Sequence, residues 1–278
     1  MISKRPVLLF IDAGNTRVKW ACVAVDAKFQ LPVPWETFDS CSHQELQQLS
    51  QSISRYAVLR CLVSNVAGEH FQIALEQQLH AVYPDLQVER FRSSANCAGI
   101  TNLYREVEKL GSDRFASAIA AHRVFPKQAI VMATCGTATT VDAITADGTF
   151  LGGMILPGLQ LMASSLAKNT AQLPEITAQA AMSGLFADHT NQAIASGCIH
   201  AQLGAILCAA SELQNHPKNA GNLPVQLVLS GGAAPYLIPH LQRWQQVTPS
   251  IQLVWHQLEN TVLTGLWIVA QASNVSTS

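Results

Sequence analysis

The chain has few charged residues and no long uninterrupted apolar run. Only 13% of its 278 residues are charged, and the formal net charge is −1. Such a balance gives no electrostatic case for nucleic acid or an anionic membrane as a partner. No apolar run reaches the about 18–20 residues of a membrane span. The run before Asp12 is also shorter than the roughly 7–15 residues of a signal-peptide core, so a buried first strand is expected there.

Several common reaction centres are absent as well. The seven cysteines are scattered and odd in number, and no CxxC pair occurs. A disulfide framework or structural zinc site is therefore not expected, and free thiols fit a reducing cytoplasm. The sequence has no HExxH or paired histidines, no GxSxG, and no Walker A or GxGxxG loop. These absences remove support for metal-hydrolase and α/β-hydrolase chemistry.

Hydrophobic residues nevertheless make up 49% of the chain, and their pattern alternates between strands and helices. Strands are predicted at 7–11, 17–25, 37–38, 59–63, 86–91, 129–133, 139–144, 150–156, 225–229 and 251–255. Helices are predicted at 44–53, 69–82, 112–124, 159–168, 191–214, 235–244 and 259–272. The order favours an α/β fold.

A strand, a glycine turn and a second strand occur twice, at 7–25 and at 129–145. Two unrelated hairpins would explain this, but so would a duplicated α/β domain, with one glycine turn from each copy facing a cleft. Pro126 breaks the helix that precedes the second hairpin, which places the boundary between domains at 1–125 and 126–278.

The first turn reads DAGNTRVK at 12–19. Glycine allows close approach of the backbone, and successive N–H groups in a tight turn can hold an anion. Lys19 can reach a phosphate, and Asp12 at the strand end can hold Mg²⁺, most simply through water. An ordinary hairpin turn with a favourable asparagine is the alternative.

The second turn reads CGTATTVD at 135–142, and a third glycine turn, SGGA at 230–233, follows an apolar strand and opens a helix. Small residues and hydroxyls suit contact with a nucleotide, although β-propensity alone also explains the threonines. Upstream, GSDR at 111–114 precedes a helix. One interpretation makes Ser112 or Asp113 the N-cap of that helix. The other makes Asp113 a general base and Arg114 a clamp for a carboxylate.

Taken in order, these motifs resemble those of the type III pantothenate kinase family, within the acetate-and-sugar-kinase/Hsp70/actin superfamily. The matching segments span nearly the whole chain: DAGNTRVK at 12–19, GSDR at 111–114, CGTATTVD at 135–142, GTFLGGMILPGLQLMASSL at 148–166, TAQLP at 170–174, HTNQAIASG at 189–197 and LSGG at 229–232. The resemblance implies two ribonuclease-H-like domains in an actin-like duplication, ATP in the cleft, and a cytoplasmic homodimer with pantothenate near the subunit interface.

The resemblance also assigns roles to residues. Asp113 becomes the catalytic base that takes the proton of the pantothenate hydroxyl. The implied pantothenate site is Tyr104, Gly111, Ser112, Asp113, Arg114 and Thr190. The implied ATP site is Asp12, Ala13, Gly14, Asn15, Thr16, Arg17, Val18, Lys19, Gly136, Thr137, Gly231 and Gly232, with Mg²⁺ at Asp12.

One position departs from the family pattern. Many members carry an aspartate for K⁺ or NH₄⁺ two residues before the second-turn glycine, where this chain has Thr134. A weakened or absent monovalent-cation site is therefore expected. Three alternatives to a pantothenate kinase remain: another small-molecule kinase of the same fold, a non-catalytic accessory factor of a transcriptional regulator, and a plain α/β binding protein.

Overall fold

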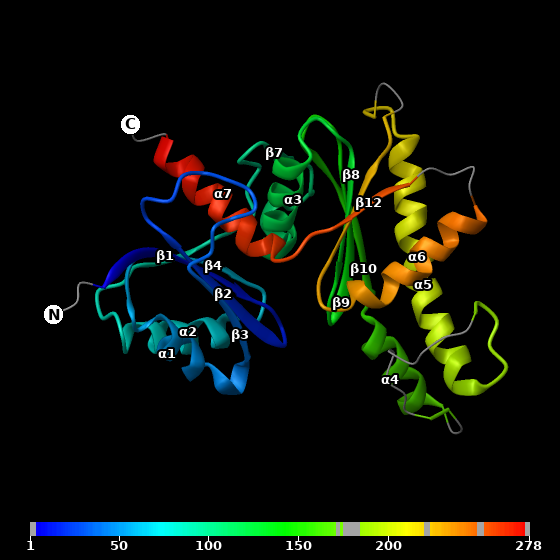
Figure 1. The fold of residues 1–278 in the computed structure, drawn as a ribbon, viewed down its shortest axis with the longest axis horizontal. Coiled ribbons are helices and arrows are strands. Elements are labelled where there is room, and N and C mark those ends of the chain that lie inside the picture. The colour runs from blue at the N-terminus through cyan, green and yellow to red at the C-terminus, as the bar shows by residue number, and fades with distance from the viewer. Residues whose placement is uncertain (1–3, 171–172, 175–183, 220–222, 249–252, 276–278) are drawn as a thin grey trace. The chain divides into compact units, whose positions relative to one another are not determined.

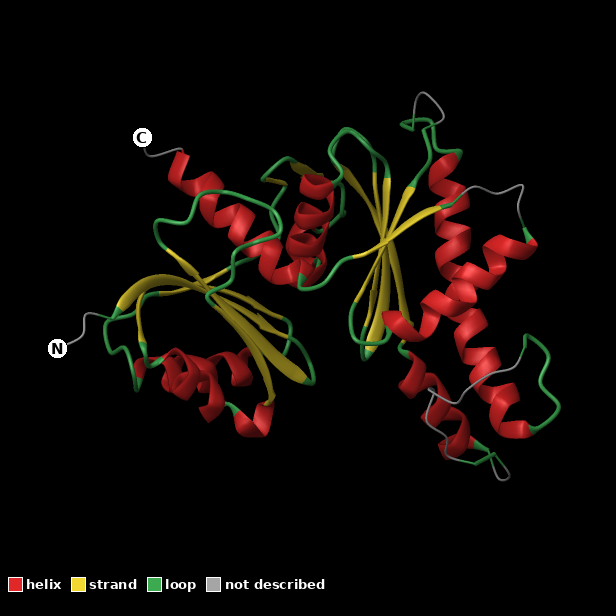
Figure 2. Ribbon diagram, viewed as in Figure 1, coloured by secondary structure: helices red, strands yellow, loops and turns green. Residues whose placement is uncertain are grey.

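The computed structural model describes residues 4–170, 173–174, 184–219, 223–248 and 253–275, and the chain divides into two compact units. Unit 1 comprises Met1–Val124 and Thr261–Ser278, and unit 2 comprises Phe125–Asn260. Each unit is a mixed α/β structure with its own sheet (Figures 1 and 2). The α/β class predicted from the sequence is confirmed. Residues 171–172 of the TAQLP motif and 251–252 of a predicted strand lie outside the described residues.

Unit 1 is built on a sheet with the strand order β3-β2-β1-β4-β5. The strands are β1 (Arg5–Ala13), β2 (Arg17–Ala24), β3 (Thr37–Ser42), β4 (Tyr56–Asn65) and β5 (Val88–Arg90). The first three strands are antiparallel neighbours, and β4 runs parallel to both β1 and β5. The glycine turn at 14–16 therefore lies at the same end of the sheet as the carboxyl end of β4.

Helices cover both faces of this sheet (Figure 1). On one face, α1 (Gln47–Ile53) and α2 (Glu69–His80) pack against Val7, Leu9, Ile11 and Ala13, the odd-numbered residues of β1. On the other face lie α3 (Ser112–Val124) and α7 (Thr261–Val275). The alternation of side chains along β1 thus supplies two apolar layers, because successive residues point to opposite faces.

The position of helix α7 differs from the predicted division into domains 1–125 and 126–278. The helix packs in unit 1 and not with the rest of the C-terminal half. The fully buried Trp267 meets Phe10 of β1 edge to face, with ring centroids 6.1 Å apart. A Cβ added to Gly265 would lie closer than 3.0 Å to the backbone of Ala116 in α3. The apolar pattern predicted the helix, but it could not predict which sheet the helix covers.

Unit 2 contains a second sheet, in which five strands follow one another in the order β12-β11-β8-β9-β10. They are β8 (Ile130–Cys135), β9 (Ala138–Ile144), β10 (Thr149–Pro157), β11 (Gln226–Ser230) and β12 (Val254–Gln257). As in unit 1, an antiparallel hairpin is joined by a parallel strand, here β11 beside β8. Its helices are α4 (Leu159–Asn169), α5 (Thr190–Gln214) and α6 (Ala234–Val247).

The long helix α5 is strongly apolar. By length and composition it passes as a membrane span, with a mean hydropathy of 1.6 over its best window. Half of that window is buried inside the protein, and Ile199, Leu203 and Ile206 belong to the core of unit 2. This burial is what a core helix requires, so the hydropathy of α5 is explained by packing.

Four short elements were not predicted from the sequence pattern. They are β6 (Asn96–Cys97), β7 (Ile100–Asn102) and the 3₁₀ turns η1 (His43–Glu45) and η2 (Val107–Lys109). Elements of two or three residues are too short to show a hydrophobic period. Strand β3 also extends past the predicted 37–38, because Asp39 and Ser40 interrupt the apolar signal while the ladder to β2 continues.

Candidate active site

The first hairpin turn joins β1 to β2 through Gly14, Asn15 and Thr16. The Gly14 N–H donates to the Arg17 carbonyl over 3.1 Å and closes the turn. Asp12 and Lys19 are cross-strand partners at its base. The sequence-predicted phosphate loop is therefore a short, closed hairpin end with one acidic and one basic residue on the same face.

The carboxyl of Asp12 has a strongly shifted pKa. Burial raises the pKa of its carboxyl to about 7, against a lowering by Lys19, and Asp113 raises it further. Asp113 is therefore near enough to interact, although 101 residues of chain separate them. A partly buried carboxylate whose charge is poorly compensated is a suitable ligand for a cation.

Asp113 lies in the first turn of α3, which begins at Ser112. Neither Ser112 nor Asp113 precedes the helix, so the N-cap interpretation of these two residues is wrong. The Asp113 Oδ1 instead accepts a hydrogen bond of 2.8 Å from the N–H of Arg114. Burial raises the pKa of Asp113, while this N–H and the charge of Arg114 oppose the rise.

The start of α3 is fixed to the sheet by a buried contact between two hydroxyls. Ser112 Oγ lies 2.8 Å from Ser64 Oγ on β4, and Ser64 is the ladder partner of Asp12. At Gly111, any Cβ would approach Asp113 Oδ1 to 2.5 Å. The glycine therefore leaves the space that the Asp113 carboxylate occupies beside the end of β1.

Tyr104 and Arg114 form a second group next to Asp113. The Arg114 guanidinium lies 5.8 Å from the centre of the Tyr104 ring, within the range of a cation–π contact. Arg114 is only 7% exposed. The Tyr104 N–H donates to Asn102 Oδ1 over 2.9 Å, which orders the segment before η2. Unit 1 therefore gathers an acid, a guanidinium and an aromatic ring near the start of α3.

The second hairpin turn, at Gly136 and Thr137, is contacted by backbone atoms. The Gly136 N–H donates to the Ala138 carbonyl over 3.0 Å, and the Gly158 N–H donates to the Thr137 carbonyl over 2.9 Å. A Cβ on Gly158 would lie closer than 3.0 Å to carbonyl oxygens of both turn residues. Glycine at 158 thus lets the start of α4 rest directly on the turn.

The third glycine turn meets the same hairpin. Gly231 has a φ of +88°, which favours glycine, and a Cβ there would collide with the backbone of Cys135. The Ala233 N–H donates to the Cys135 carbonyl over 3.0 Å. Around Gly232 no atom would lie within 4 Å of an added Cβ. The structure brings together the second and third turns, and it leaves open space on one side of them.

A buried amide that the sequence analysis did not single out supports this region. Gln202 of α5 is fully buried. Its Oε1 accepts from Thr139 Oγ1 over 2.9 Å, and its Nε2 donates to the Pro157 carbonyl over 2.9 Å. It therefore connects β9 to the junction of β10 and α4. The available signal was a glutamine among the apolar residues in the middle of α5.

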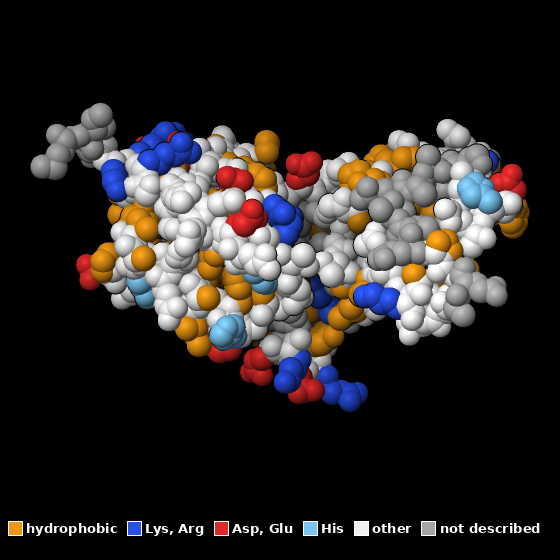
Figure 3. Space-filling view, turned by 90° about the horizontal axis from the view of Figure 1, so that it is seen from below, with side chains coloured by type: hydrophobic (Ala, Val, Ile, Leu, Met, Phe, Trp, Pro, Cys, Tyr) orange, Lys and Arg blue, Asp and Glu red, His pale blue; other side chains and the backbone are white. Residues whose placement is uncertain are grey.

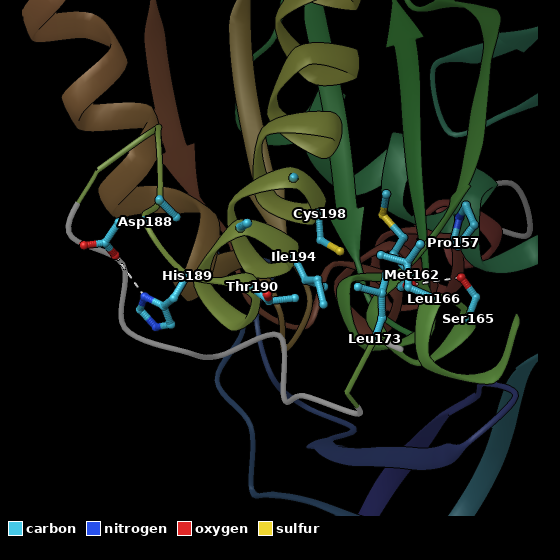
Figure 4. A pocket seen from close by; sticks show the side chains of 13 residues that line it. Pro157, Met162, Ser165, Leu166, Leu173, Asp188, His189, Thr190, Ile194 and Cys198 are labelled. Atoms are coloured by element: carbon cyan, nitrogen blue, oxygen red, sulfur yellow. Dashed lines mark hydrogen bonds and ion pairs between the residues drawn. The ribbon is translucent and has the colours of Figure 1, made fainter. Parts of the chain in front are cut away.

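Thr134 and Thr190 lie elsewhere in unit 2. Thr134 on β8 is the ladder partner of Thr140 and Ser230, which places hydroxyl side chains on three neighbouring strands. Thr190 is the first residue of α5 and lines a cavity of about 770 Å³ (Figure 4). Next to it, His189 Nδ1 lies 3.0 Å from Asp188 Oδ1.

The wall of this cavity is mostly apolar, with Met162, Leu166, Ile194 and Cys198 facing it from α4 and α5 (Figure 4). Within the described residues, no group of three or more His, Cys, Asp or Glu side chains could hold a metal ion by itself. A metal ion held by Asp12 would therefore need further ligands from the nucleotide or from water.

Comparison with known proteins gives a consistent result. A family model described as type III pantothenate kinase matches residues 8–212. The chain is 44% identical to a type III pantothenate kinase of Herminiimonas arsenicoxydans, over 95% of this chain and 97% of that protein. It is 45% identical to the one from a Janthinobacterium species, with the same coverage of each chain.

Solved structures with less sequence similarity share the fold. A protein from Campylobacter jejuni assigned as a Baf family transcriptional activator superposes with a TM-score of 0.59 at 18% identity, covering 96% of this chain and 99% of that one. A Listeria monocytogenes protein assigned as an N-acetylmannosamine kinase gives 0.54 at 14%, covering 96% and 100%. At these identities the likeness concerns the fold alone.

Proposed function

The chain belongs to the type III pantothenate kinase family, and from this premise we propose how its residues transfer the γ-phosphoryl group of ATP to pantothenate. The observation that carries the proposal is the group around Asp113: a carboxylate of raised pKa beside Arg114, next to the acidic end of β1. Phosphoryl transfer asks a protein chiefly for positioning and charge stabilisation, and these residues supply both.

Asp113 is the general base in this proposal. Burial raises its pKa, which makes the carboxylate a better proton acceptor than an exposed aspartate. It takes the proton of the primary hydroxyl of pantothenate as that oxygen attacks the γ-phosphorus, while the bond from this phosphorus to the β,γ-bridging oxygen breaks and ADP leaves. The N–H of Arg114 holds one carboxylate oxygen and so orients the other.

Pantothenate is an anion, and Arg114 is the residue for its carboxylate. A planar guanidinium binds a carboxylate through two parallel hydrogen bonds. The ring of Tyr104 lies against Arg114 and limits its movement. Gly111 and Ser112 line the same site, and we assign Thr190 to pantothenate on the basis of the family motif.

The first turn, Asp12 to Lys19, is assigned to the ATP phosphates. Its backbone N–H groups and Lys19 offer donors to anionic oxygens. The desolvated carboxylate of Asp12 fits a Mg²⁺ ion, since a cation would offset the charge that burial disfavours. When bound, Mg²⁺ supplies positive charge to the phosphate oxygens.

The second and third turns are assigned to the rest of the nucleotide. Gly136, Thr137 and Gly232 are exposed and present backbone without large side chains, so a ligand can approach closely. Gly231 packs on the Cys135 backbone and shapes the turn that carries Gly232. At Thr134 we propose a monovalent-cation site that is weak or absent, because a hydroxyl is a poorer ligand for K⁺ or NH₄⁺ than a carboxylate.

We also propose a homodimer in the cytoplasm. Unit 2 exposes several large apolar side chains on β10, α4 and the segment before α5: Met154, Ile155, Leu161, Leu166, Leu185 and Phe186. Phe186 is 92% exposed, which favours cover by a partner surface.

Acidic and basic side chains occur together on the face in Figure 3, in keeping with the net charge of −1 and with small molecules as ligands.

The test is to incubate the purified protein with ATP, Mg²⁺ and pantothenate and to detect 4′-phosphopantothenate by mass. Product in the complete mixture, absent without pantothenate, supports the proposal. A parallel panel of sugars and acetate identifies another small-molecule kinase. Nucleotide binding without any product, together with capture of a response regulator, would favour the accessory-factor alternative.

A further inference from the structure

The side chain of His43 holds the first hairpin turn. Its Nε2 lies 2.8 Å from the carbonyl oxygen of Gly14, 29 residues earlier in the chain. A carbonyl oxygen only accepts, so Nε2 carries the hydrogen and donates it. The turn is therefore held from outside the hairpin as well as by its own bond between Gly14 and Arg17.

His43 is itself held in place on two sides. Its ring stacks on Phe71 of α2, with ring centroids 4.1 Å apart and an angle of 28° between the planes. The residue before it, Ser42, donates from its hydroxyl and its N–H to Glu45 Oε2, over 2.7 and 3.3 Å. A donor fixed in this way loses little conformational freedom when it binds the turn.

His43 approaches the turn from the face of the sheet that carries α1 and α2. Phe71 shares a buried cluster with Ile11, Ala13 and Val18 on that face. Asp12 and Lys19 alternate with these residues and project to the other face. The hydrogen bond and the charged pair therefore lie on opposite sides of the hairpin.

This arrangement sets the direction of one peptide group. In a trans peptide the C=O and the following N–H point in opposite directions. Since the Gly14 carbonyl is directed to His43, the N–H of Asn15 is directed to the side of Asp12 and Lys19. A rotated peptide would present an oxygen there, which repels phosphate.

We infer that His43 is a positioning residue for ATP: it fixes the Gly14–Asn15 peptide so that an N–H faces the phosphates. The inference rests on the proposed assignment of the first turn to the phosphates. His43 does not touch the reacting atoms, so its effect falls on ATP and not on pantothenate.

Two substitutions separate the donor from the ring. His43→Phe keeps the stack on Phe71 and removes the N–H. His43→Gln removes the ring and keeps an N–H at a similar reach. We expect His43→Phe to raise the KM for ATP about tenfold, the effect of losing one hydrogen bond to an ordered group. The KM for pantothenate and the melting temperature should stay near wild type, and His43→Gln should stay within about threefold.

His80 provides a matched control in the same unit. Its Nε2 also meets a backbone carbonyl, that of Leu86, at 3.0 Å, beyond the far end of α2. His80→Phe should leave the KM for ATP unchanged. Titration of each variant with a non-hydrolysable ATP analogue and Mg²⁺ gives a second readout that needs no turnover.

The outcomes are distinct. A selective loss of ATP affinity in His43→Phe, rescued in His43→Gln, supports the inference. Equal losses in both His43 variants, or a loss in His80→Phe, would overturn it in favour of packing. If the wild type makes no 4′-phosphopantothenate, the proposed reaction fails, while the analogue titration still decides on His43: weaker binding in His43→Phe alone supports it, and unchanged or absent binding overturns it.

Discussion

The two glycine hairpins of this chain share a topology and differ in their surroundings. Each joins two antiparallel strands, with a third strand parallel to the first. Near Asp12, at the base of the first turn, lie Lys19 and the carboxylate of Asp113, whereas the second hairpin end packs against the backbone at Gly158 and Gly231. In the proposed function, similar scaffolds are given different tasks: charge for the reaction in unit 1, and backbone without large side chains for the nucleotide in unit 2.

The largest effect should come from removing Asp113, the proposed base. Asp113→Asn keeps the size of the side chain and an oxygen for the Arg114 N–H, but it cannot accept the proton. We expect kcat to fall by about 10²-fold or more. Steady-state kinetics measures this, with Asp39→Asn on the exposed part of β3 as control.

Comparable rates in Asp113→Asn and wild type would assign Asp113 to binding or helix structure. The charged turn would then hold phosphate without taking part in proton transfer, and the contrast between the two units would weaken.

The backbone turn should respond instead to added bulk. Gly231→Ala places a methyl group against the Cys135 backbone at a φ of +88°, so either the turn moves or the fold is strained. We expect a rise of about tenfold in the KM for ATP and a loss of roughly 1–3 kcal/mol in unfolding free energy.

Gly204→Ala on α5 is the matched control for this substitution, because an added Cβ there meets no atom within 4 Å. It should stabilise the helix by up to about 1 kcal/mol. If Gly231→Ala binds ATP as wild type does, close approach of backbone at this turn is not needed for the nucleotide.

The cation prediction concerns Thr134, in unit 2. With a hydroxyl at this position, activity in K⁺ should exceed activity in a large organic cation by less than tenfold at matched ionic strength. Stimulation of tenfold or more would show that backbone carbonyls suffice for the site. Thr134→Asp should increase the dependence on K⁺.

The smallest expected effect is a change of stability with pH at Asp12. Its folded pKa of about 7 lies above the ordinary value of about 4, so the folded state loses stability as the pH rises through this interval. Asparagine cannot ionise. Without nucleotide or divalent cation, Asp12→Asn should melt about 2–6 °C above wild type at pH 8, and the difference should vanish below about pH 4.

Asp85→Asn, at an exposed position, controls for the general effect of removing a charge. Equal melting curves of Asp12→Asn and wild type across this range would mean that the Asp12 carboxylate is well compensated in the fold. The charged turn would then lack the unbalanced charge that we assign to it.

The sequence predicted what depends on neighbours along the chain. Both hairpins follow from a glycine between two apolar runs, and the GSDR segment does begin a helix. It could not reveal His43, whose partners Gly14 and Phe71 are each about 28 residues away. Gln202 is similar, because its role depends on β9 and the end of β10.

The placement of α7 has a consequence for the order of events during synthesis. Unit 2 is one continuous segment, whereas unit 1 needs residues 261–275 to cover Phe10 and the backbone of α3. On the ribosome, unit 2 can fold as soon as its residues emerge, but the face of unit 1 that receives Trp267 stays open until residues 261–275 have emerged as well. A polypeptide that stops before residue 261 therefore leaves Phe10 and the backbone of α3 uncovered, and unit 1 is complete only after its two distant parts have met.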